Sequence, residues 1–483
     1  MTHAVTLFAI LLLPAASAVV SAQTLAPLDR QAWLDDLGEA RTALSTKYAG
    51  LEWEVFERDV DLSAIFATAE DRIAHADNDW EAHRIFERLM DRFGDRHVLI
   101  RWPSVNQHPE RSLGGLSCEG MGYTTDMQAE PLLAFLPGFT PIPLPPQNVF
   151  PTGMVVRGSR RVGIIKIPLF MALGFPSLCE LALGDLHVDR TSQCDDDCRG
   201  RVWARAEIIL TLQFEAAIEA VKATGASVLV VDLAGNTGGS EWEGAASRMV
   251  TPIRLESLRN YFVKEPLWVR HFEQQKHDLE NARRGARRED RKLLTRFIEQ
   301  VGEREREARE LCDASALWKG KHPSCNRLGD AFFSTGLLSS ADPEALRAKP
   351  WAPLVFSPLQ YPYHEGVWRG PLVVVVDGHS ASASEHFAAE LQDNHSAVVV
   401  GSPTYGAGCG STDGGTPTQL PHSGGILEVS DCVRIRKNGQ NLANGVQPDI
   451  LVGFRENDSA KRRAFLLNEK LDLVLEAADA LGR

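Results

Sequence analysis

Residues 371–393 read PLVVVVDGHSASASEHFAAELQD, and their pattern indicates the fold that we expect for the core of the chain. The run 371–376 is apolar and rich in β-branched valine, which is typical of a buried strand in a parallel sheet. Residues 386–393 contain strong helix formers with apolar side chains at helical spacing. A strand therefore ends and a helix begins among three serines, Ser380, Ser382 and Ser384.

A serine at the start of a helix has the surroundings that a nucleophile needs. The free backbone N–H groups and the helix macrodipole at that end favour a developing negative charge. The competing interpretation is helix capping, a common role of serine, and we expect one of the three serines to cap the helix. The charge of Glu385 in the first turn also favours the helix start.

Size and composition indicate a soluble globular protein with more than one structural unit. The 483 residues exceed what one ordinary core accommodates, and 44% of them are hydrophobic while 24% are charged. The net charge of −13 argues against a nucleic-acid-binding protein, which normally has a basic face. No stretch beyond the N-terminal segment is long enough for a membrane span.

Residues 1–22 resemble a secretory signal peptide. The apolar run LFAILLL at 7–13 is followed by AVVSA at 18–22, which has the small residues of a cleavage site. The run is short for a membrane anchor, which is the alternative interpretation. We therefore expect the mature protein to be exported, either to a periplasm or to the extracellular space.

The eight cysteines, an even number, agree with an oxidising compartment. Three neighbouring pairs are candidates for disulfides, namely Cys194 with Cys198, Cys312 with Cys325, and Cys409 with Cys432. The connectivity cannot be read from the sequence, and a metal site at Cys194 and Cys198 is the alternative for the first pair. No second ligand pair lies at a suitable spacing, which argues against the metal site.

The rest of the chain divides into regions by its residue pattern. We expect a helical domain at 23–102 that ends in a strand over 95–102, and a connecting region rich in Pro and Gly at 103–160. The core follows at 161–455, with a helical insertion at about 265–350, and the C-terminal helix occupies 456–483. The insertion is interpreted as a solvated, ion-paired segment, with a regulatory or partner-binding lid as the alternative.

Two strand–helix–strand units are expected in the core. The first combines a strand at 161–168, a helix at 202–224 and a strand at 228–233. The second combines the strand at 372–376, the helix that follows it and a strand at 397–401. This order predicts parallel βαβ units and an α/β fold.

Three segments could form a nucleophilic site. They are Ser382 with the backbone N–H of Ala383, the turn DLAGNTGG at 232–239, and His97 as a general base with an unperturbed pKa of about 6.5. A glycine-rich turn lets backbone N–H groups converge on an oxyanion, while Asp232 is expected to fix the turn. Neither a Gly-Lys-Ser/Thr ending nor a G-x-G-x-x-G is present, which argues against nucleotide binding. Residues 378–382 lack the last glycine of the G-x-S-x-G elbow.

Several of these blocks together resemble a known family. The sequence GHSASASE at 378–385, AAELQD at 388–393 and VVVGSPTYG at 398–406 is similar to the carboxyl-terminal-processing and tricorn family of serine peptidases. The turn VVDLAGNTGG at 230–239 and the segment NGVQPDI at 444–450 resemble further motifs of that family. The resemblance implies a crotonase-like (ClpP/crotonase) α/β core.

The resemblance also implies roles for individual residues. Ser382 would be the nucleophile, and Ala383 and Gly238, with Gly239 beside it, would supply the oxyanion N–H groups. The processing proteases use a lysine as base, but Ala407 stands at that position, so the Ser-Lys pair is excluded. The tricorn-like branch uses a histidine within a D-x-H motif, which 95–97 matches, so the resemblance implies His97 as the base.

The group that orients His97 is left open by the sequence. The tricorn-like branch has a glutamate just before its closing motif, where this chain reads NLAN at 441–444. The orienting group is then a backbone carbonyl, Asp95, another acid, or missing. His379 is a rival base, although its place at the strand end favours a structural role.

Two hypotheses of different classes follow. The first is an exported serine-type endopeptidase that acts on peptide or protein substrates through an acyl-enzyme on Ser382. This mechanism needs neither a metal nor an organic cofactor. The second is a catalytically inactive protein on the same fold that binds a peptide or an apolar ligand between the helical domain and the core. The sequence leaves the oligomeric state open.

Overall fold

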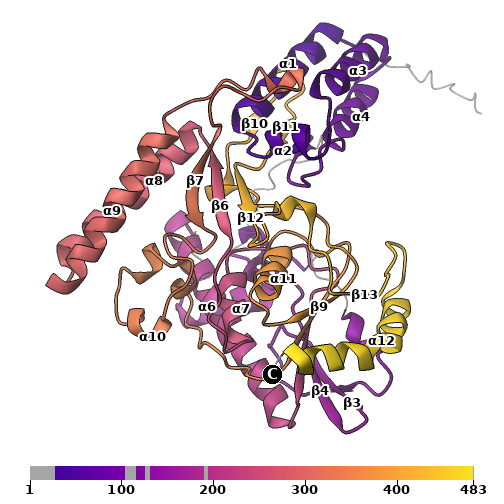
Figure 1. Cartoon of the computed structure of the whole chain (residues 1–483), viewed down its shortest axis with the longest axis vertical. Helices are drawn as coiled ribbons and strands as arrows, with labels where there is room; N and C mark the ends of the chain where they lie inside the picture. Colours follow the sequence, from indigo (N-terminus) through magenta and orange to yellow (C-terminus); the bar gives the residue numbers. More distant parts are fainter. Residues whose placement is uncertain (1–27, 104–115, 126–130, 190–193, 482–483) are drawn as a thin grey trace, which may run out of the picture.

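The computed structural model describes residues 28–103, 116–125, 131–189 and 194–481, and these residues form a mixed α/β fold (Figure 1). The expected signal peptide at 1–22 lies outside the described residues. No described helix is both long and apolar enough to cross a membrane.

A seven-stranded sheet forms the centre of the core. Its strand order is β13-β9-β8-β5-β4-β3-β2, and the five strands from β13 to β4 are parallel while β3 and β2 run antiparallel. The strands are β2 (Thr140–Pro141), β3 (Thr152–Arg157), β4 (Arg160–Lys166), β5 (Val228–Asp232), β8 (Leu372–Val376), β9 (Val398–Gly401) and β13 (Ile450–Leu451). The expected connecting region at 103–160 thus contributes two strands to this sheet.

The two predicted βαβ units are confirmed. The first is β4, α6 (Asp196–Ala223) and β5, and the second is β8, α11 (Ala383–Asp393) and β9. Helix α6 begins earlier than the apolar pattern predicted because the Asp195 carboxylate accepts a hydrogen bond from the Cys198 N–H and caps the helix.

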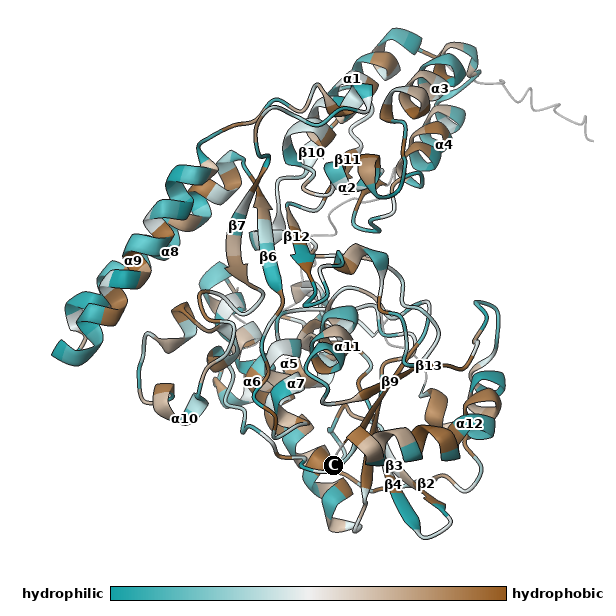
Figure 2. Cartoon of the chain, viewed as in Figure 1, coloured by the Kyte–Doolittle hydropathy of each residue, from teal (hydrophilic) through white to brown (hydrophobic). Residues whose placement is uncertain are grey.

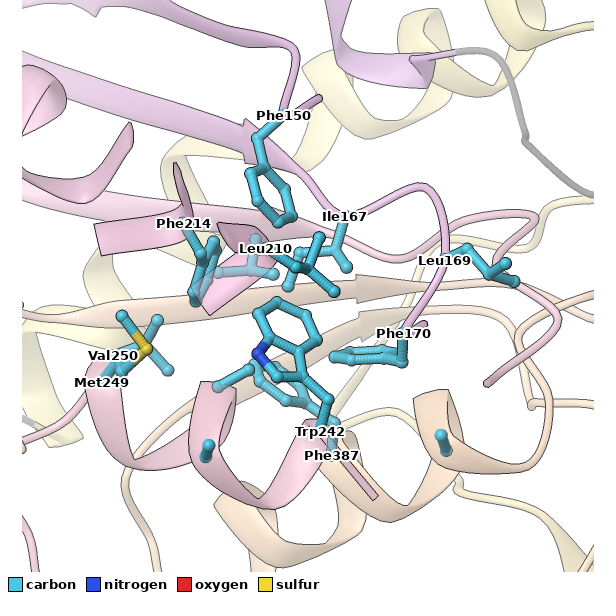
Figure 3. Packing of buried hydrophobic residues seen from close by; sticks show 14 of the residues in the cluster. Phe150, Ile167, Leu169, Phe170, Leu210, Phe214, Trp242, Met249, Val250 and Phe387 are labelled. Carbon is cyan, nitrogen blue, oxygen red and sulfur yellow. The ribbon is translucent and has the colours of Figure 1, made fainter. Parts of the chain in front are cut away.

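Each face of the sheet carries its own core. On one face the sheet packs with α5 (Pro176–Asp185), α6, α7 (Glu243–Met249) and α11, and Figure 3 shows Trp242 at the middle of this cluster among aromatic and aliphatic side chains. On the other face it packs with the short 3-10 helix η2 (Leu132–Phe135) and with α12 (Ala460–Leu481). Strands β5, β8 and β9 are apolar apart from Asp232 and Gly401 at their ends, and all their residues are buried, because a parallel strand is covered on both faces. Figure 2 shows the hydrophobic colour of β9.

The N-terminal region is a bundle of helices, namely α1 (Arg30–Lys47), α2 (Leu51–Phe56), α3 (Leu62–His75) and α4 (Asp79–Met90). It is joined to the rest of the chain by a small sheet in which β1 (Leu99–Arg101) pairs with β11 (Ile426–Glu428), which in turn pairs with β10 (Thr418–Gln419). The predicted strand over 95–102 is wrong in its first half. Residues 95–98 form a turn instead, because Asp95 accepts hydrogen bonds from the backbone of both His97 and Val98.

The insertion contains a strand in addition to helices. A helical hairpin of α8 (Pro266–Gly285) and α9 (Arg288–Ala308) extends away from the core (Figure 1), with ion pairs such as Lys276 to Glu305 at 3.0 Å. The chain then returns through β7 (Leu328–Phe333), which pairs with β6 (Arg259–Val263), and β6 pairs with β12 (Cys432–Ile435). The short helix α10 (Pro343–Leu346) follows.

All eight cysteines form disulfides. The three neighbouring pairs named above are bonded, and Cys118 is bonded to Cys179, a pair that the sequence spacing did not indicate. The alternative in which Cys194 and Cys198 bind a metal is therefore wrong, because their sulfurs are joined to each other.

Candidate active site

Ser382 lies at the junction of β8 and α11 in a conformation that non-glycine residues rarely adopt. Its backbone angles are φ 53° and ψ −115°, immediately before the first helical residue, Ala383. Such a conformation costs on the order of 1–3 kcal/mol and persists only where the surroundings impose it. Here the neighbouring Ala381 N–H donates to the Asn236 carbonyl at 3.0 Å, which holds the turn against the one after β5.

The three serines of the turn have different surroundings. The Ser380 hydroxyl donates to the Leu233 carbonyl at 2.8 Å, and the Ser384 hydroxyl donates to the Asn236 carbonyl at 2.9 Å. Both of these side chains are fully buried. Ser382 is instead half-buried and lines a cavity of about 750 Å³. It is the serine of the three that a substrate can reach.

The glycine-rich turn after β5 lies directly against Ser382. A Cβ atom on Gly238 would lie 2.8 Å from both the Ala381 carbonyl oxygen and the Ser382 Cβ, and the φ of Gly238 is +109°. Only glycine therefore fits this position without displacing the serine turn.

The two glycines of this turn differ in what their N–H groups do. The Gly238 N–H donates to the Asn236 side-chain oxygen at 2.8 Å, so it is not available to an oxyanion. The N–H groups of Gly239 and Ala383 have no hydrogen-bond partner among the described residues, and both residues line the same cavity as Ser382. The expectation that the Gly238 N–H donates to an oxyanion is therefore corrected. The N–H groups of Gly239 and Ala383 remain as the candidate oxyanion donors.

His97 enters the same cavity from the N-terminal region. About a quarter of its side chain is exposed, and its Nε2 lies against Gly410, where an added Cβ would approach within 3.4 Å. Its Nδ1 lies 3.3 Å from Asp95 Oδ1, an ion-pair distance, although the approach does not meet hydrogen-bond geometry. Burial lowers the pKa of His97, but contact with the Asp95 carboxylate, the charge of Glu385 and the Ala407 carbonyl together raise it above its ordinary value.

Asp95 is itself held in place. Its Oδ1 accepts a hydrogen bond from the His97 N–H at 3.0 Å, and its Oδ2 accepts one from the Ser430 hydroxyl at 2.6 Å. Of the orienting groups that the sequence left open, the structure brings two next to the imidazole, namely Asp95 and the backbone carbonyl of Ala407. Ser430, in the loop before β12, carries no sequence signal that could have identified it.

Glu385 connects the serine turn to the loop beneath His97. Its carboxylate accepts hydrogen bonds from the N–H groups of Ser382 at 2.9 Å, Gly406 at 2.7 Å and Ala407 at 2.8 Å, and from the Thr404 hydroxyl at 2.5 Å. Burial raises the pKa of Glu385 even though these donors lower it. Sequence reasoning gave Glu385 only a role at the helix start. A glutamate three residues after a capping serine is the signal that could have indicated the contact with Ser382.

The other histidines near Ser382 are placed differently. His379 is exposed and does not line the cavity. His386 is one turn along α11, is fully buried and forms an ion pair with Glu243. Asp232 is buried below the turn and accepts a hydrogen bond from the Ala234 N–H at 3.0 Å, as a residue that fixes the turn would do.

The walls of the cavity come from several distant segments. The aromatic part is formed by side chains of α6, α8, β7 and the segment before β8, namely Trp203, Trp268, Phe272, Phe332, Phe333 and Tyr361. The disulfide between Cys409 and Cys432 forms another part of the wall and joins the loop beneath His97 to β12. A peptide-sized opening thus surrounds a serine, an imidazole and two free N–H groups.

Comparison with protein families assigns the core. The family model described as "Peptidase family S41" matches residues 205–452, which is just over half of the 483 residues. The chain belongs to peptidase family S41. Ser382, Ala383, Glu385 and both glycines lie inside the matched segment of this S41 peptidase, whereas His97 lies outside it.

Similar proteins cover smaller segments. A protein of Chlamydia pneumoniae is 32% identical over 133 residues, 26% of this chain and 20% of that protein. The carboxy-terminal-processing protease of Bartonella bacilliformis is 32% identical over 84 residues, 17% of this chain and 18% of that protein. The S41 peptidase thus matches about a fifth of the length of these relatives.

Solved structures show the same fold over nearly the whole chain. Mature CPAF aligns with 93% of this chain and 98% of its own at a TM-score of 0.55, with 14% identity. A crystal structure of a CPAF mutant aligns over the same shares at a TM-score of 0.58, also with 14% identity. At this identity the likeness concerns the fold alone.

Proposed function

We propose that this S41 peptidase is an exported serine endopeptidase of the Ser-His type, with Ser382 as nucleophile and His97 as general base. The observation that carries the proposal is that one cavity is lined by Ser382, His97, and the free N–H groups of Gly239 and Ala383. These are the parts that acyl transfer requires, namely a nucleophile, a base and two donors for the oxyanion.

The proposed reaction has two steps. The Ser382 hydroxyl attacks the peptide carbonyl and passes its proton to Nε2 of His97, because Nδ1 faces Asp95. The Gly239 and Ala383 N–H groups stabilise the oxyanion, and the amine leaves with the proton from His97. Water, deprotonated by His97, then attacks the ester carbon and releases the acid product with Ser382 restored.

The Ser-His assignment rests on the loop beneath His97. Ala407, at the position where the resemblance expects a lysine, has no side-chain nitrogen. Its carbonyl instead faces His97, and its N–H is bound by Glu385, which also binds the Ser382 N–H. The absence of a lysine at Ala407, and the position of His97 in the same cavity as Ser382, support His97 as the base.

Two features support export. The first is the signal-peptide pattern at 1–22, and the second is the pairing of every cysteine in a disulfide, a state that persists in oxidising compartments. Expression of the whole chain in a Gram-negative host, followed by fractionation and N-terminal sequencing, tests this part. Cleavage after residue 22 and recovery outside the cytoplasm are the expected results.

Hydrolysis of fluorescently labelled casein tests the activity. Wild type is expected to release peptides, and Ser382→Ala is expected to reduce the rate by at least about 10³-fold, since nucleophilic catalysis is lost. Ser411→Ala is the matched control, because Ser411 lines the same cavity and has no assigned role. Equal rates for wild type and Ser382→Ala would contradict the proposal and would favour a binding protein on the same fold.

A further inference from the structure

A second cavity, of about 450 Å³, lies at the carboxyl ends of β4 and β5 beneath the segment 131–152. Its size is within the range of about 300–1,000 Å³ that small-molecule sites occupy. It does not share a lining residue with the cavity around Ser382.

The walls of this cavity are mostly apolar, with Asn148 and Thr152 as the polar side chains outside its floor. The apolar side chains are prolines, aliphatic residues and two phenylalanines, namely Pro131, Leu133, Ala134, Phe139, Pro141, Ile142, Leu144, Pro145, Pro146, Val149, Phe150, Pro151 and Ile164. Ala134, Pro141, Pro145 and Pro146 are exposed and form the mouth, whereas Phe150 is buried and lies deeper. Five prolines hold this wall in a fixed shape, because each fixes its own backbone φ.

The floor of the cavity is a buried ion pair. Lys166 and Asp232 are register partners on β4 and β5, and their exposed fractions are 1% and 0%. Nζ of Lys166 lies 3.6 Å from Oδ1 of Asp232 and donates a hydrogen bond to the Ala234 carbonyl. An ion pair in an apolar site is costly unless its remaining polar atoms are satisfied.

One oxygen of this floor is not satisfied. Oδ2 of Asp232 is buried and has no hydrogen-bond partner among the residues that the structure describes. The Leu133 N–H approaches the carboxylate but does not reach hydrogen-bond geometry. The carboxylate cannot turn to correct this, because Oδ1 is fixed by the Ala234 N–H at 3.0 Å and by Lys166. A buried acceptor without a donor costs about 1–3 kcal/mol, so a donor from a ligand would be strongly favoured.

We propose that this cavity binds a small uncharged molecule with an apolar body and one primary amide, or an equivalent group that both donates and accepts a hydrogen bond. The amide N–H would donate to Oδ2 of Asp232. The amide oxygen would accept a hydrogen bond from the third N–H of the Lys166 ammonium group, since the other two face Ala234 and Asp232. The ion pair has no net charge, so a charged ligand would leave an unbalanced charge in an apolar site. The apolar walls enclose the body of the ligand.

Octanamide, octanoate and octylammonium are matched probes that differ only in the head group. Binding of each to the full chain is measured by isothermal titration calorimetry, and it does not depend on peptidase activity. We expect octanamide to bind at least about tenfold more tightly than either ion, since one satisfied buried hydrogen bond corresponds to about that factor. Equal affinities for all three probes, or no binding of octanamide, would contradict the proposal and would leave water as the occupant.

The location of the site is tested with variants at its mouth. Ala134→Trp is expected to weaken octanamide binding by about tenfold or more, because the indole would block the entrance, whereas Ala134→Ser leaves the entrance open and keeps the affinity. Ala134 is exposed, so the fold should tolerate both changes, and circular dichroism checks this. Pro145→Trp gives a second obstruction at the same mouth. Unchanged octanamide binding in both tryptophan variants would overturn the assignment to this cavity.

Discussion

Ser382 and His97 line one cavity although they come from opposite ends of the chain, the first from the α/β core and the second from the turn that follows the N-terminal helices. The loop at 406–410 contacts His97 and is hydrogen-bonded to Glu385 of the serine turn. The imidazole of His97 lies against Ala407 and Gly410 of this loop. The Glu385 carboxylate accepts a hydrogen bond from the Ala407 N–H and another from the Ser382 N–H. Changes to this loop or to Asp95 are therefore expected to act on the pairing of the two residues.

Replacing Asp95 with asparagine should move the pH profile of hydrolysis. Burial lowers the pKa of His97, and the Asp95 carboxylate reverses this and raises it, so the neutral base appears only as the pH rises through a pKa above the ordinary value. Asp95→Asn removes the negative charge, and the acid limb of the kcat/KM profile is expected to shift to lower pH. The position of the limb is independent of how much enzyme is folded. Asp91→Asn is the control, because Asp91 is an exposed acid in the same segment between α4 and β1. An acid limb of Asp95→Asn that shifts to higher pH, or does not shift, would refute the role of Asp95.

The disulfide between Cys409 and Cys432 is expected to support activity. It ties the loop beneath His97 to β12, and the Asp431 N–H adds a hydrogen bond to the Gly410 carbonyl at 3.2 Å. Loss of this restraint should reduce hydrolysis by about tenfold to hundredfold, since small displacements of catalytic groups have effects of this size. The double serine variant of this pair is compared with that of Cys194 and Cys198, which closes a short interval at the start of α6. Equal losses in the two variants would show that the effect is only one on folding.

Glu207 should make the protein less stable as the pH rises. Burial raises the pKa of its carboxyl to about 7, although the Ala172 N–H, which donates to it at 3.0 Å, lowers it. The folded state therefore binds its proton more tightly than the unfolded state, so stability is full below about pH 4.3 and is lost as the pH rises through the folded pKa, by roughly 3 kcal/mol in total. Glu207→Gln cannot ionise, so its Tm relative to wild type should increase between pH 5 and pH 8. A difference that stays constant or shrinks over this range would contradict the raised pKa.

Gly238→Ala should unfold or inactivate the protein. The added Cβ would lie 2.8 Å from the Ala381 carbonyl oxygen on a backbone with φ +109°, and we expect a loss of about 2–4 kcal/mol in the free energy of unfolding. Gly200→Ala is the matched control, because no described atom lies within 4 Å of a Cβ added to this helical glycine, and the variant should gain about 0.5–1 kcal/mol. Chemical denaturation measures both, and similar stabilities of the two variants would rule out the close approach at Ser382.

The sequence predicted the parts of the molecule that depend on local pattern. The valine-rich runs at β5, β8 and β9 identified the parallel strands, because burial on both faces leaves no alternation. Ser382 could be singled out from its neighbours through the resemblance, and the structure separates it by the partners of the Ser380 and Ser384 hydroxyls. The assignments of Ser382 and His97 remain predictions until they are tested chemically.

What the sequence did not predict depends on contacts between distant segments. Whether Gly238 or Gly239 has a free N–H is decided by the orientation of the Asn236 side chain, which has no sequence pattern. The disulfide between Cys118 and Cys179 joins residues that are 61 positions apart in the sequence. Strand β7 belongs to a charged segment predicted to be helical, yet it pairs with β6. Ser430 reaches Asp95 across the junction of the N-terminal bundle and the core.

Mass-spectrometric mapping of a fluorophosphonate adduct tests the assignment of Ser382 and His97 as nucleophile and base, because such probes react with activated serines. We expect one adduct, on Ser382, that is absent in Ser382→Ala and forms about 10²–10⁴-fold more slowly in His97→Ala. The adduct should form at the wild-type rate in His379→Ala, since His379 is exposed and outside the cavity. An adduct on another serine, no adduct on the wild-type protein, or labelling of His97→Ala at the wild-type rate would contradict this assignment.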